Sequence, residues 1–186
     1  MTVNDMKQLE AELEKQELEA AGGTPAPQIY TQLLTVYLYH NDLCNAKLLW
    51  RRIPESVKAA NPELASIWAI GQSMWLRNFA GVHQALAQRD TWSEAVTPIM
   101  EALKNQIRSS ALALVGRAYS SLTVEVLSEF LGETPEQALA SAEAQPGWKV
   151  EGGMVIPCRP PPPDGPPLSC EDQLDKLTEF VAFLEN

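Results

Sequence analysis

Histidine is almost absent from this sequence, and its scarcity limits the chemistry that the chain can perform. The only histidines are His40 and His83, and neither forms part of a zinc motif such as H-x-H or H-E-x-x-H. The glycine pairs at 22–23 and 152–153 lack the lysine and the spacing of phosphate-binding loops. We therefore expect no catalytic residue, no metal ion, no cofactor, no small-molecule substrate and no enzyme activity.

Long apolar runs and paired cysteines are also missing. The longest uncharged apolar stretch is 33–39, which is far shorter than the roughly 20 residues of a membrane-spanning helix. Cys44, Cys158 and Cys170 are an odd number at wide spacing, which indicates reduced thiols rather than a disulfide framework. The first residues carry acids and bases throughout and do not resemble a secretory signal. We expect a protein of the cytoplasm and nucleus that does not bind membranes.

Basic residues are few compared with acidic ones. The chain has 14 Lys and Arg against 24 Asp and Glu, a formal net charge of -10. The average field therefore repels phosphate, so binding to nucleic acid would need a local basic patch.

Apolar residues at three- and four-residue spacing predict a mostly α-helical chain. They indicate helices over residues 5–20, 28–40, 43–53 and 62–75. Asn78 and Phe79 repeat Asp42 and Leu43 at an offset of 36 residues. This offset predicts two degenerate helical hairpins of tetratricopeptide-like length, so we interpret residues 1–107 as a helical-repeat region.

After residue 107 the pattern predicts a different unit. One helical stretch ends near 107, and further short helices are expected over 111–119, over 126–131 and from Thr134 onward. Two short strands follow at 148–150 and 154–156, joined by a glycine-bearing turn. Three helices and a hairpin are the order of a winged helix, which we place at residues 108–157.

The charges of this expected winged helix disfavour DNA. Residues 109–157 contain two basic and six acidic residues, and the candidate recognition helix at 135–145 has no Lys or Arg. A helix that reads DNA normally supplies such side chains to bases and phosphates. We instead predict an interface with another protein at the strand Met154, Val155 and Ile156, which we expect to form a free sheet edge.

A proline-rich linker at 158–170 separates this unit from a terminal helix at 171–186. Seven of the eleven residues from Pro157 to Pro167 are proline, which predicts a stiff extended segment. The helix beyond it carries an apolar stripe typical of a coiled coil. The stripe predicts a helical bundle with a partner, or packing on the chain's own domain, through Leu174, Leu177, Phe180, Val181 and Leu184.

The tryptophans at positions 50, 68 and 75 lie on apolar helical faces. We expect all three to fill the core, although tryptophan is also frequent at binding hot spots.

Four runs of the sequence resemble the PCI family, whose members build the proteasome lid, the cullin-deneddylating signalosome and the third translation initiation factor. The runs are IYTQLLTVYLYHNDLCNAKLLWRRIP, IWAIGQSMWLRNFAGVHQAL, WSEAVTPIMEAL and the ending KLTEFVAFLEN. They are most similar to a small signalosome subunit, and the similarity covers about residues 16–156 and 171–186.

This resemblance implies a non-catalytic scaffold in the complex that removes the ubiquitin-like modifier Nedd from cullin-RING ubiquitin ligases. The winged helix would join a ring of PCI subunits, beside the third one, and the terminal helix would enter a shared helical bundle. The alternatives are a PCI subunit of the proteasome lid or of the initiation factor, a nucleic-acid-binding regulator with a winged helix, and a free-standing enzyme.

Overall fold

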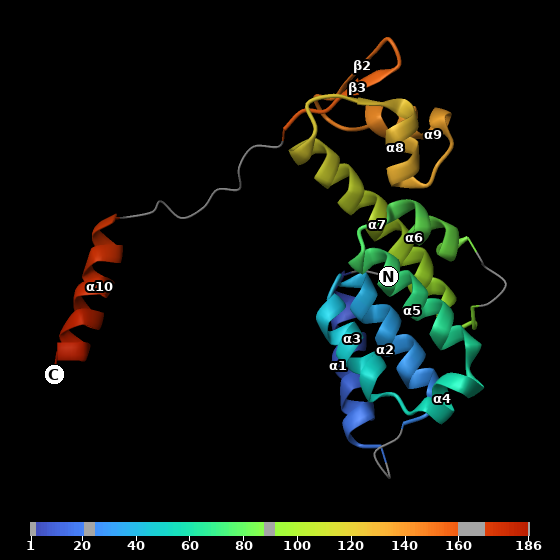
Figure 1. The fold of residues 1–186 in the computed structure, drawn as a ribbon, viewed down its shortest axis with the longest axis vertical. Helices are drawn as coiled ribbons and strands as arrows, with labels where there is room; N and C mark the ends of the chain where they lie inside the picture. Colours follow the sequence, from blue (N-terminus) through green and yellow to red (C-terminus); the bar gives the residue numbers. More distant parts are fainter. Residues whose placement is uncertain (1–2, 21–24, 88–91, 160–169, 186) are drawn as a thin grey trace.

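The computed structural model describes residues 3–20, 25–87, 92–159 and 170–185, and they are mostly helical. Figure 1 shows α1 to α6 gathered around one half of α7, the strands with α8 and α9 at its other end, and α10 set apart. We call residues 3–107 the helical body and residues 108–156 the lobe. The elements are α1 (Val3–Leu18), α2 (Pro27–Tyr39), α3 (Leu43–Arg52), α4 (Glu55–Ala60), α5 (Pro62–Trp75), α6 (Phe79–Leu86), α7 (Thr97–Ala118), β1 (Leu122–Thr123), α8 (Val124–Leu131), α9 (Pro135–Glu143), β2 (Lys149–Glu151), β3 (Met154–Ile156) and α10 (Cys170–Glu185).

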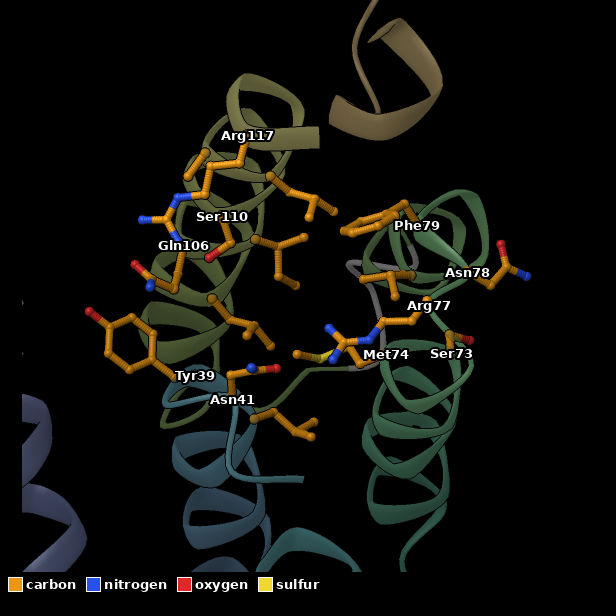
Figure 2. Close-up of a pocket in the computed structure, with 16 residues that line it drawn as sticks. Tyr39, Asn41, Ser73, Met74, Arg77, Asn78, Phe79, Gln106, Ser110 and Arg117 are labelled. Carbon is orange, nitrogen blue, oxygen red and sulfur yellow. The ribbon is translucent and has the colours of Figure 1, made fainter. Parts of the chain in front are cut away.

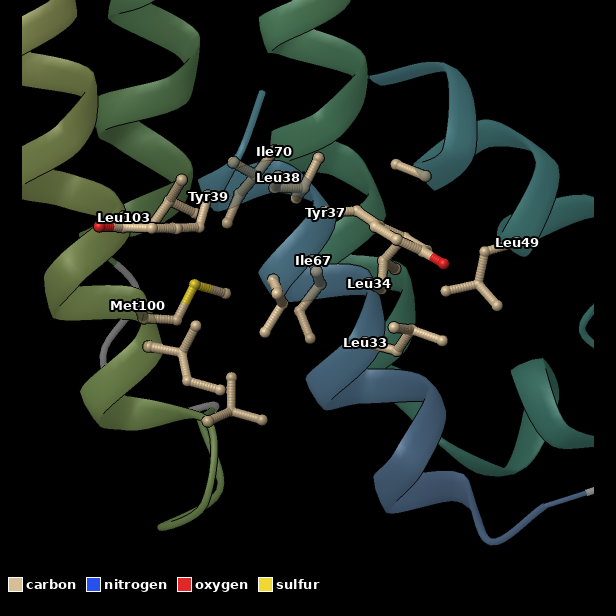
Figure 3. Close-up of a cluster of buried hydrophobic side chains, with 14 of the residues drawn as sticks. Leu33, Leu34, Tyr37, Leu38, Tyr39, Leu49, Ile67, Ile70, Met100 and Leu103 are labelled. Atoms are coloured by element: carbon tan, nitrogen blue, oxygen red, sulfur yellow. The ribbon is translucent and has the colours of Figure 1, made fainter. Parts of the chain in front are cut away.

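Helix α2 is the centre of the body because it is apolar around most of its circumference. Nine of its 13 residues are buried, and Figure 3 shows its leucines and tyrosines between α5, α3 and α7. Two of the nine are threonines, whose hydroxyls donate to backbone carbonyls of the same helix, Thr31 to Gln28 at 2.8 Å and Thr35 to Thr31 at 2.7 Å. Both polar groups are therefore satisfied inside the core.

Two turns of the body have the same geometry 36 residues apart. Asn41 and Arg77 adopt positive φ angles of 58° and 56°. The next residue in each case, Asp42 or Asn78, caps the following helix by accepting a hydrogen bond from a backbone N–H three residues on, both at 3.0 Å. The left-handed residue reverses the chain, and the cap starts the next helix.

Helix α1 lies against α2 and α3 through both apolar and polar contacts. Met6 and Leu13 are buried, while carboxylates along the same side of the helix bind the neighbouring helices. The Tyr37 hydroxyl donates to Glu14 at 2.7 Å, and Arg52 donates two bonds to Glu17 at 2.8 and 2.7 Å. Burial and the Glu14 carboxylate raise the pKa of Tyr37 above its ordinary value of 10.

Helix α7 is one continuous helix of 22 residues, so the prediction of separate helices at 97–107 and 111–119 was wrong. The two ends of α7 belong to different hydrophobic clusters. The cluster of the body ends with Ile107, and the cluster of the lobe begins with Ala111. The apolar face of α7 changes direction between Ile107 and Ala111, while the backbone remains helical. The apolar spacing in the sequence is therefore interrupted there, although the helix is not.

The lobe contains a small antiparallel sheet in the order β1-β3-β2. Leu122 pairs with Val155, and Val155 also faces Val150. Strand β3 therefore lies in the middle of the sheet, and the expectation that it forms a free edge was wrong. The sequence did not reveal β1 because this strand is only two residues long and exists through its pairing with β3.

Capping residues begin both helices of the lobe. The hydroxyl oxygens of Thr123 and Thr134 accept bonds from the backbone N–H groups of Val126 and Gln137, both at 3.4 Å. Gly132 ends α8 in the left-handed conformation, with φ 60°, where a residue without a side chain is favoured.

The same glycine lies at the contact between body and lobe. A Cβ atom on Gly132 would be 2.3 Å from His83 Cγ, so only glycine lets α8 approach α6 this closely. His83 Nε2 donates to the Phe130 carbonyl at 2.9 Å. Arg108 of α7 adds a bond to the Leu131 carbonyl at 3.2 Å and an ion pair with Glu133 at 3.0 Å. The end of α8 is thus held by two elements of the chain that precede it.

Candidate protein–protein interfaces

Helix α10 exposes the whole apolar stripe that the sequence predicted as a bundle surface. Its leucines, its valine and Phe180 are between 51% and 80% exposed. None of them belongs to either hydrophobic cluster, and Figure 1 shows α10 apart from the other helices. The structure therefore brings the predicted bundle residues together on one helix, with no covering surface from the described part of the chain: Leu174, Leu177, Phe180, Val181 and Leu184.

Strand β3 divides the second predicted interface between the core and the surface. Val155 is fully buried, whereas Met154 and Ile156 are 41% and 37% exposed, as the alternation of side chains along a strand requires. Val155 is therefore a core residue of the lobe. Met154 and Ile156 remain surface residues, and they lie on the outer face of the sheet.

Cross-strand neighbours complete this outer face. Lys149 pairs with Ile156, and Glu151 and Thr123 pair with Met154. The two apolar side chains are thus flanked by one base, one acid and one hydroxyl, all on exposed positions. The face can bury apolar area against a partner while its rim stays polar, which is the usual composition of a protein–protein contact.

Both histidines have structural contacts with parts of the chain distant in sequence. His40 at the end of α2 binds the Glu10 carboxylate of α1, and His83 contacts α8. Burial lowers the pKa of His83 below its ordinary value, because a protonated ring would carry its charge inside the molecule. Within the described residues, no three His, Cys, Asp or Glu side chains lie close enough to hold a metal ion.

The tryptophans differ from one another in their surroundings. Trp50 and Trp68 stack at a centroid distance of 5.3 Å and an interplanar angle of 7°, and both pack against the core of the body. Trp75 is 51% exposed, with the Lys47 ammonium 4.8 Å from the centroid of its ring. The prediction that Trp75 fills the core was wrong, because half of its side chain is open to solvent beside Lys47 of α3.

A groove that the sequence did not reveal lies along α7 (Figure 2), and we call it the arginine groove. Its volume is about 330 Å³. Met74, Phe79 and Leu114 are among its apolar lining, and Arg77 of the turn between α5 and α6 and Arg117 of α7 bring positive charge. The lining contains no Asp or Glu. Neither arginine forms an ion pair within the described part of the chain.

The helices of the described residues can be compared with the dimensions of a bilayer. No helix among them is both long enough and apolar enough to cross a bilayer.

These features define a mostly helical protein with uncovered apolar faces on a terminal helix and on a small sheet. The sequence profile of the CSN8/PSMD8/EIF3K family matches residues 26–164. The chain therefore belongs to the CSN8/PSMD8/EIF3K family, and the resemblance inferred from the sequence is confirmed.

Three relatives show how far the similarity extends. COP9 signalosome complex subunit 8 of Danio rerio is 46% identical over 177 residues, which cover 94% of this chain and 92% of the relative. The protein of that name in Drosophila melanogaster is 35% identical over 189 residues and covers both chains fully. The one in Arabidopsis thaliana is 30% identical over 158 residues, with 84% of this chain and 79% of the relative covered.

Proposed function

We propose that this chain is a non-catalytic scaffold subunit of the COP9 signalosome, the complex that by family resemblance removes Nedd from cullin-RING ubiquitin ligases. The observation that carries the proposal is the uncovered apolar stripe of α10. A free helix of this length is marginally stable in water. A terminal helix with five large apolar side chains exposed on one face gains stability by packing against other helices.

In this proposal α10 enters a helical bundle that it shares with other subunits of the complex. Leu174, Leu177, Val181 and Leu184 follow a three-four-three spacing, which places them in one seam, and Phe180 lies beside it. These side chains are exposed in the isolated chain. The seam is therefore available to bind a partner.

The lobe would be a winged helix that joins a ring of PCI subunits beside the third subunit, and the helical body would be built from two repeats. The matching turns at Asn41 and Arg77 support the repeats. The three-stranded sheet packed with α8 and α9 supports the winged helix. Because β3 is central, the ring contact would use the outer face at Met154 and Ile156, or the edges formed by β1 and β2.

The proposal involves no cofactor, no substrate of its own, no membrane and no nucleic acid, and it locates the protein in the cytoplasm and nucleus. The sequence of α9, from Pro135 to Glu143, contains two acids and no base, so a helix in the position of a recognition helix would meet phosphate with the wrong charge. The family profile also includes proteins named for other complexes, whereas the relatives reported above are signalosome subunits. This difference favours the signalosome over the proteasome lid and the initiation factor.

The experiment is affinity purification of the tagged full chain from cells, followed by mass spectrometry. The test variant carries Leu177→Glu and Val181→Glu, which place two charges in the seam. Lys176→Glu is the matched control, because it changes the net charge by the same amount at a neighbouring position outside the seam. We expect the wild type and the control to recover the other signalosome subunits, and the double variant to recover them at least about tenfold less.

Two results would contradict the proposal. Recovery of proteasome-lid or initiation-factor subunits instead would assign the chain to the alternative complex. Full recovery by the double variant would show that α10 is not the assembling element.

A further inference from the structure

Two neighbouring openings on the helical body surround the end of α5. One is the arginine groove, between α7 and the turn from α5 to α6. The other has a volume of about 310 Å³. We call it the tryptophan pocket, because Trp68 and Trp75 of α5 line it together with Leu43 and Lys47 of α3. The buried side chain of Leu38 lines both openings, so they lie next to each other on the surface.

Apolar side chains that the packing of the body leaves uncovered lie around these openings. Trp75 is 51% exposed and Leu76, directly after it, is 75% exposed, while Leu114 on the α7 side is 43% exposed. Tryptophan is among the residues that contribute most at the centre of protein–protein contacts. An apolar cavity beside such a ring can take up an apolar side chain of a partner. The surface therefore has the apolar component of a binding site.

The described side chains that line the two openings carry positive charge only, although the whole chain has a net charge of -10. Lys47 belongs to the tryptophan pocket, Arg77 and Arg117 belong to the arginine groove, and neither lining contains Asp or Glu. Among the described residues no carboxylate forms an ion pair with any of the three. Figure 2 shows the Arg77 side chain pointing into the space between α5 and α7. The surface is therefore complementary to a partner with negative charge.

The size of the openings determines the form of this partner. Volumes of about 330 and 310 Å³ are at the lower end of the range for ligand pockets, roughly 300 to 1,000 Å³. Each opening can therefore take single side chains but not a helix. An extended peptide presents successive side chains to opposite sides. It can place an apolar side chain in a cavity and an acidic one beside a cation.

Nucleic acid is also negative and also stacks on aromatic rings, but two features favour a peptide. The openings are lined mainly by apolar side chains, which gain most from contact with apolar groups. The three cations are isolated in a chain with an excess of acids, and a long polyanion would be repelled by the rest of the molecule.

We propose that this surface binds an acidic segment of a partner protein in extended conformation. A large apolar side chain of the segment occupies the tryptophan pocket, and its carboxylates contact Lys47 and Arg77. No residue of α10 or of the sheet of the lobe lines either opening. The contact is therefore additional to those of the proposed function and does not rest on them.

Selection from a random peptide library tests the chemistry of the partner. The probe is a phage-displayed library of peptides of about eight random residues, which span roughly 25 Å when extended, and the target is the purified full chain. We expect the selected peptides to combine acidic residues with a large apolar one. Their fluorescein-labelled synthetic forms should bind with dissociation constants of roughly 1 to 100 µM. The affinity should fall several-fold between about 50 and 500 mM salt, because the charges are screened.

Substitutions locate the binding site on the chain. Lys47→Glu and Arg77→Glu should each weaken the labelled peptide about three- to tenfold, because the reversed charge repels its carboxylates. Arg51→Glu makes the same charge change on α3 at an exposed position outside both openings, and it should keep the wild-type affinity. Trp75→Ala should weaken binding at least about tenfold. Leu48→Ala removes an exposed apolar side chain that lines neither opening, and it should have no effect.

Four outcomes would overturn the proposal. They are selected peptides without acidic residues, selected peptides that bind more weakly than about 1 mM, and an unchanged affinity in Lys47→Glu or in Trp75→Ala when circular dichroism shows both chains folded. The fourth is tighter binding of a labelled random-sequence oligonucleotide than of the selected peptides, which would assign the surface to nucleic acid. Leu177→Glu with Val181→Glu should bind the peptide like the wild type, so this proposal and the proposed function can fail separately.

Discussion

Helices α1 and α10 are both 16 residues long, amphipathic and acidic, yet one is part of the body and the other is exposed. Met6 and Leu13 of α1 are buried, whereas the large apolar side chains of α10 are at least half exposed. The difference lies in what faces each helix. Helix α1 meets Tyr37 and Arg52, which bind its carboxylates, while no residue that the structure describes offers such a surface to α10.

This contrast shows that amphipathicity predicts a need for a partner and does not identify the partner. Helix α10 is the more apolar of the two, with phenylalanines where α1 has none. Apolar content alone would therefore assign α10 to the core. The polar groups that match α1 lie on α2 and α3, and only the folded chain brings them to it.

The largest expected effect comes from shortening one leucine on each helix, the buried Leu13 of α1 and the exposed Leu177 of α10. Leu13→Ala should lower the free energy of unfolding by about 2–5 kcal/mol, because Leu13 is 3% exposed and its loss leaves a cavity. Leu177→Ala should lower it by less than about 1 kcal/mol, since Leu177 is 60% exposed. Urea unfolding followed by circular dichroism measures both. Equal losses would remove the distinction between the two helices.

A second expected effect concerns the stability of the chain at alkaline pH, and it involves α1 through the contact between Tyr37 and Glu14. The pKa of Tyr37 is raised in the folded chain, so folding favours the protonated phenol. This contribution is fully present below pH 10, and it is lost as the pH rises above 10 because the unfolded phenol ionises first. Tyr37 should account for a decline of at most about 1.4 kcal/mol per pH unit.

Tyr37→Phe should make this alkaline decline shallower, with unfolding measured between pH 9 and 11. Burial also raises the pKa of Tyr30, so part of the decline should remain in the variant. Tyr119→Phe, at a ring that is 39% exposed, is the control and should keep the wild-type slope. An unchanged slope in Tyr37→Phe would mean that folding does not raise the pKa of Tyr37.

The smallest effect concerns the ion pair between α1 and α3. Arg52→Gln should cost about 0.2–1 kcal/mol, because the arginine is half exposed even though both of its bonds to Glu17 are short. The loss should shrink at 1 M salt, where charges are screened. Arg51→Gln at the adjacent exposed position is the control, and it should change the stability by less than the test variant. A loss that is independent of salt would contradict the electrostatic origin.

Local signals predicted most helices of this chain to within a few residues. The expected 28–40 corresponds to Pro27–Tyr39, and the expected hairpin at 148–156 corresponds to β2 and β3. Thr134 caps the helix that was expected to begin there, and Asp42 and Asn78 cap the helices that follow the two matching turns. Such contacts lie within three or four residues, so the sequence alone is enough to predict them.

The incorrect predictions share a different cause. The continuity of α7, the central place of β3 and the exposure of Trp75 all depend on segments that are distant in sequence. The arginine groove is the clearest case, since Arg77 and Arg117 are 40 residues apart and each alone resembles an ordinary surface residue. No local pattern could have related them, because their proximity follows from the packing of α5, α6 and α7.

The sequence by itself determined the helical class, the caps and turns, the amphipathic stripe of the last helix and the family resemblance, because each of these depends on neighbouring residues or on direct similarity. Only the tertiary structure decided which apolar faces are covered. It placed α1 on the body, made β3 an inner strand, and left the stripe of α10 and the arginine groove open. The physical reason is that burial depends on which distant segments meet, and their meeting is a property of the whole packed chain.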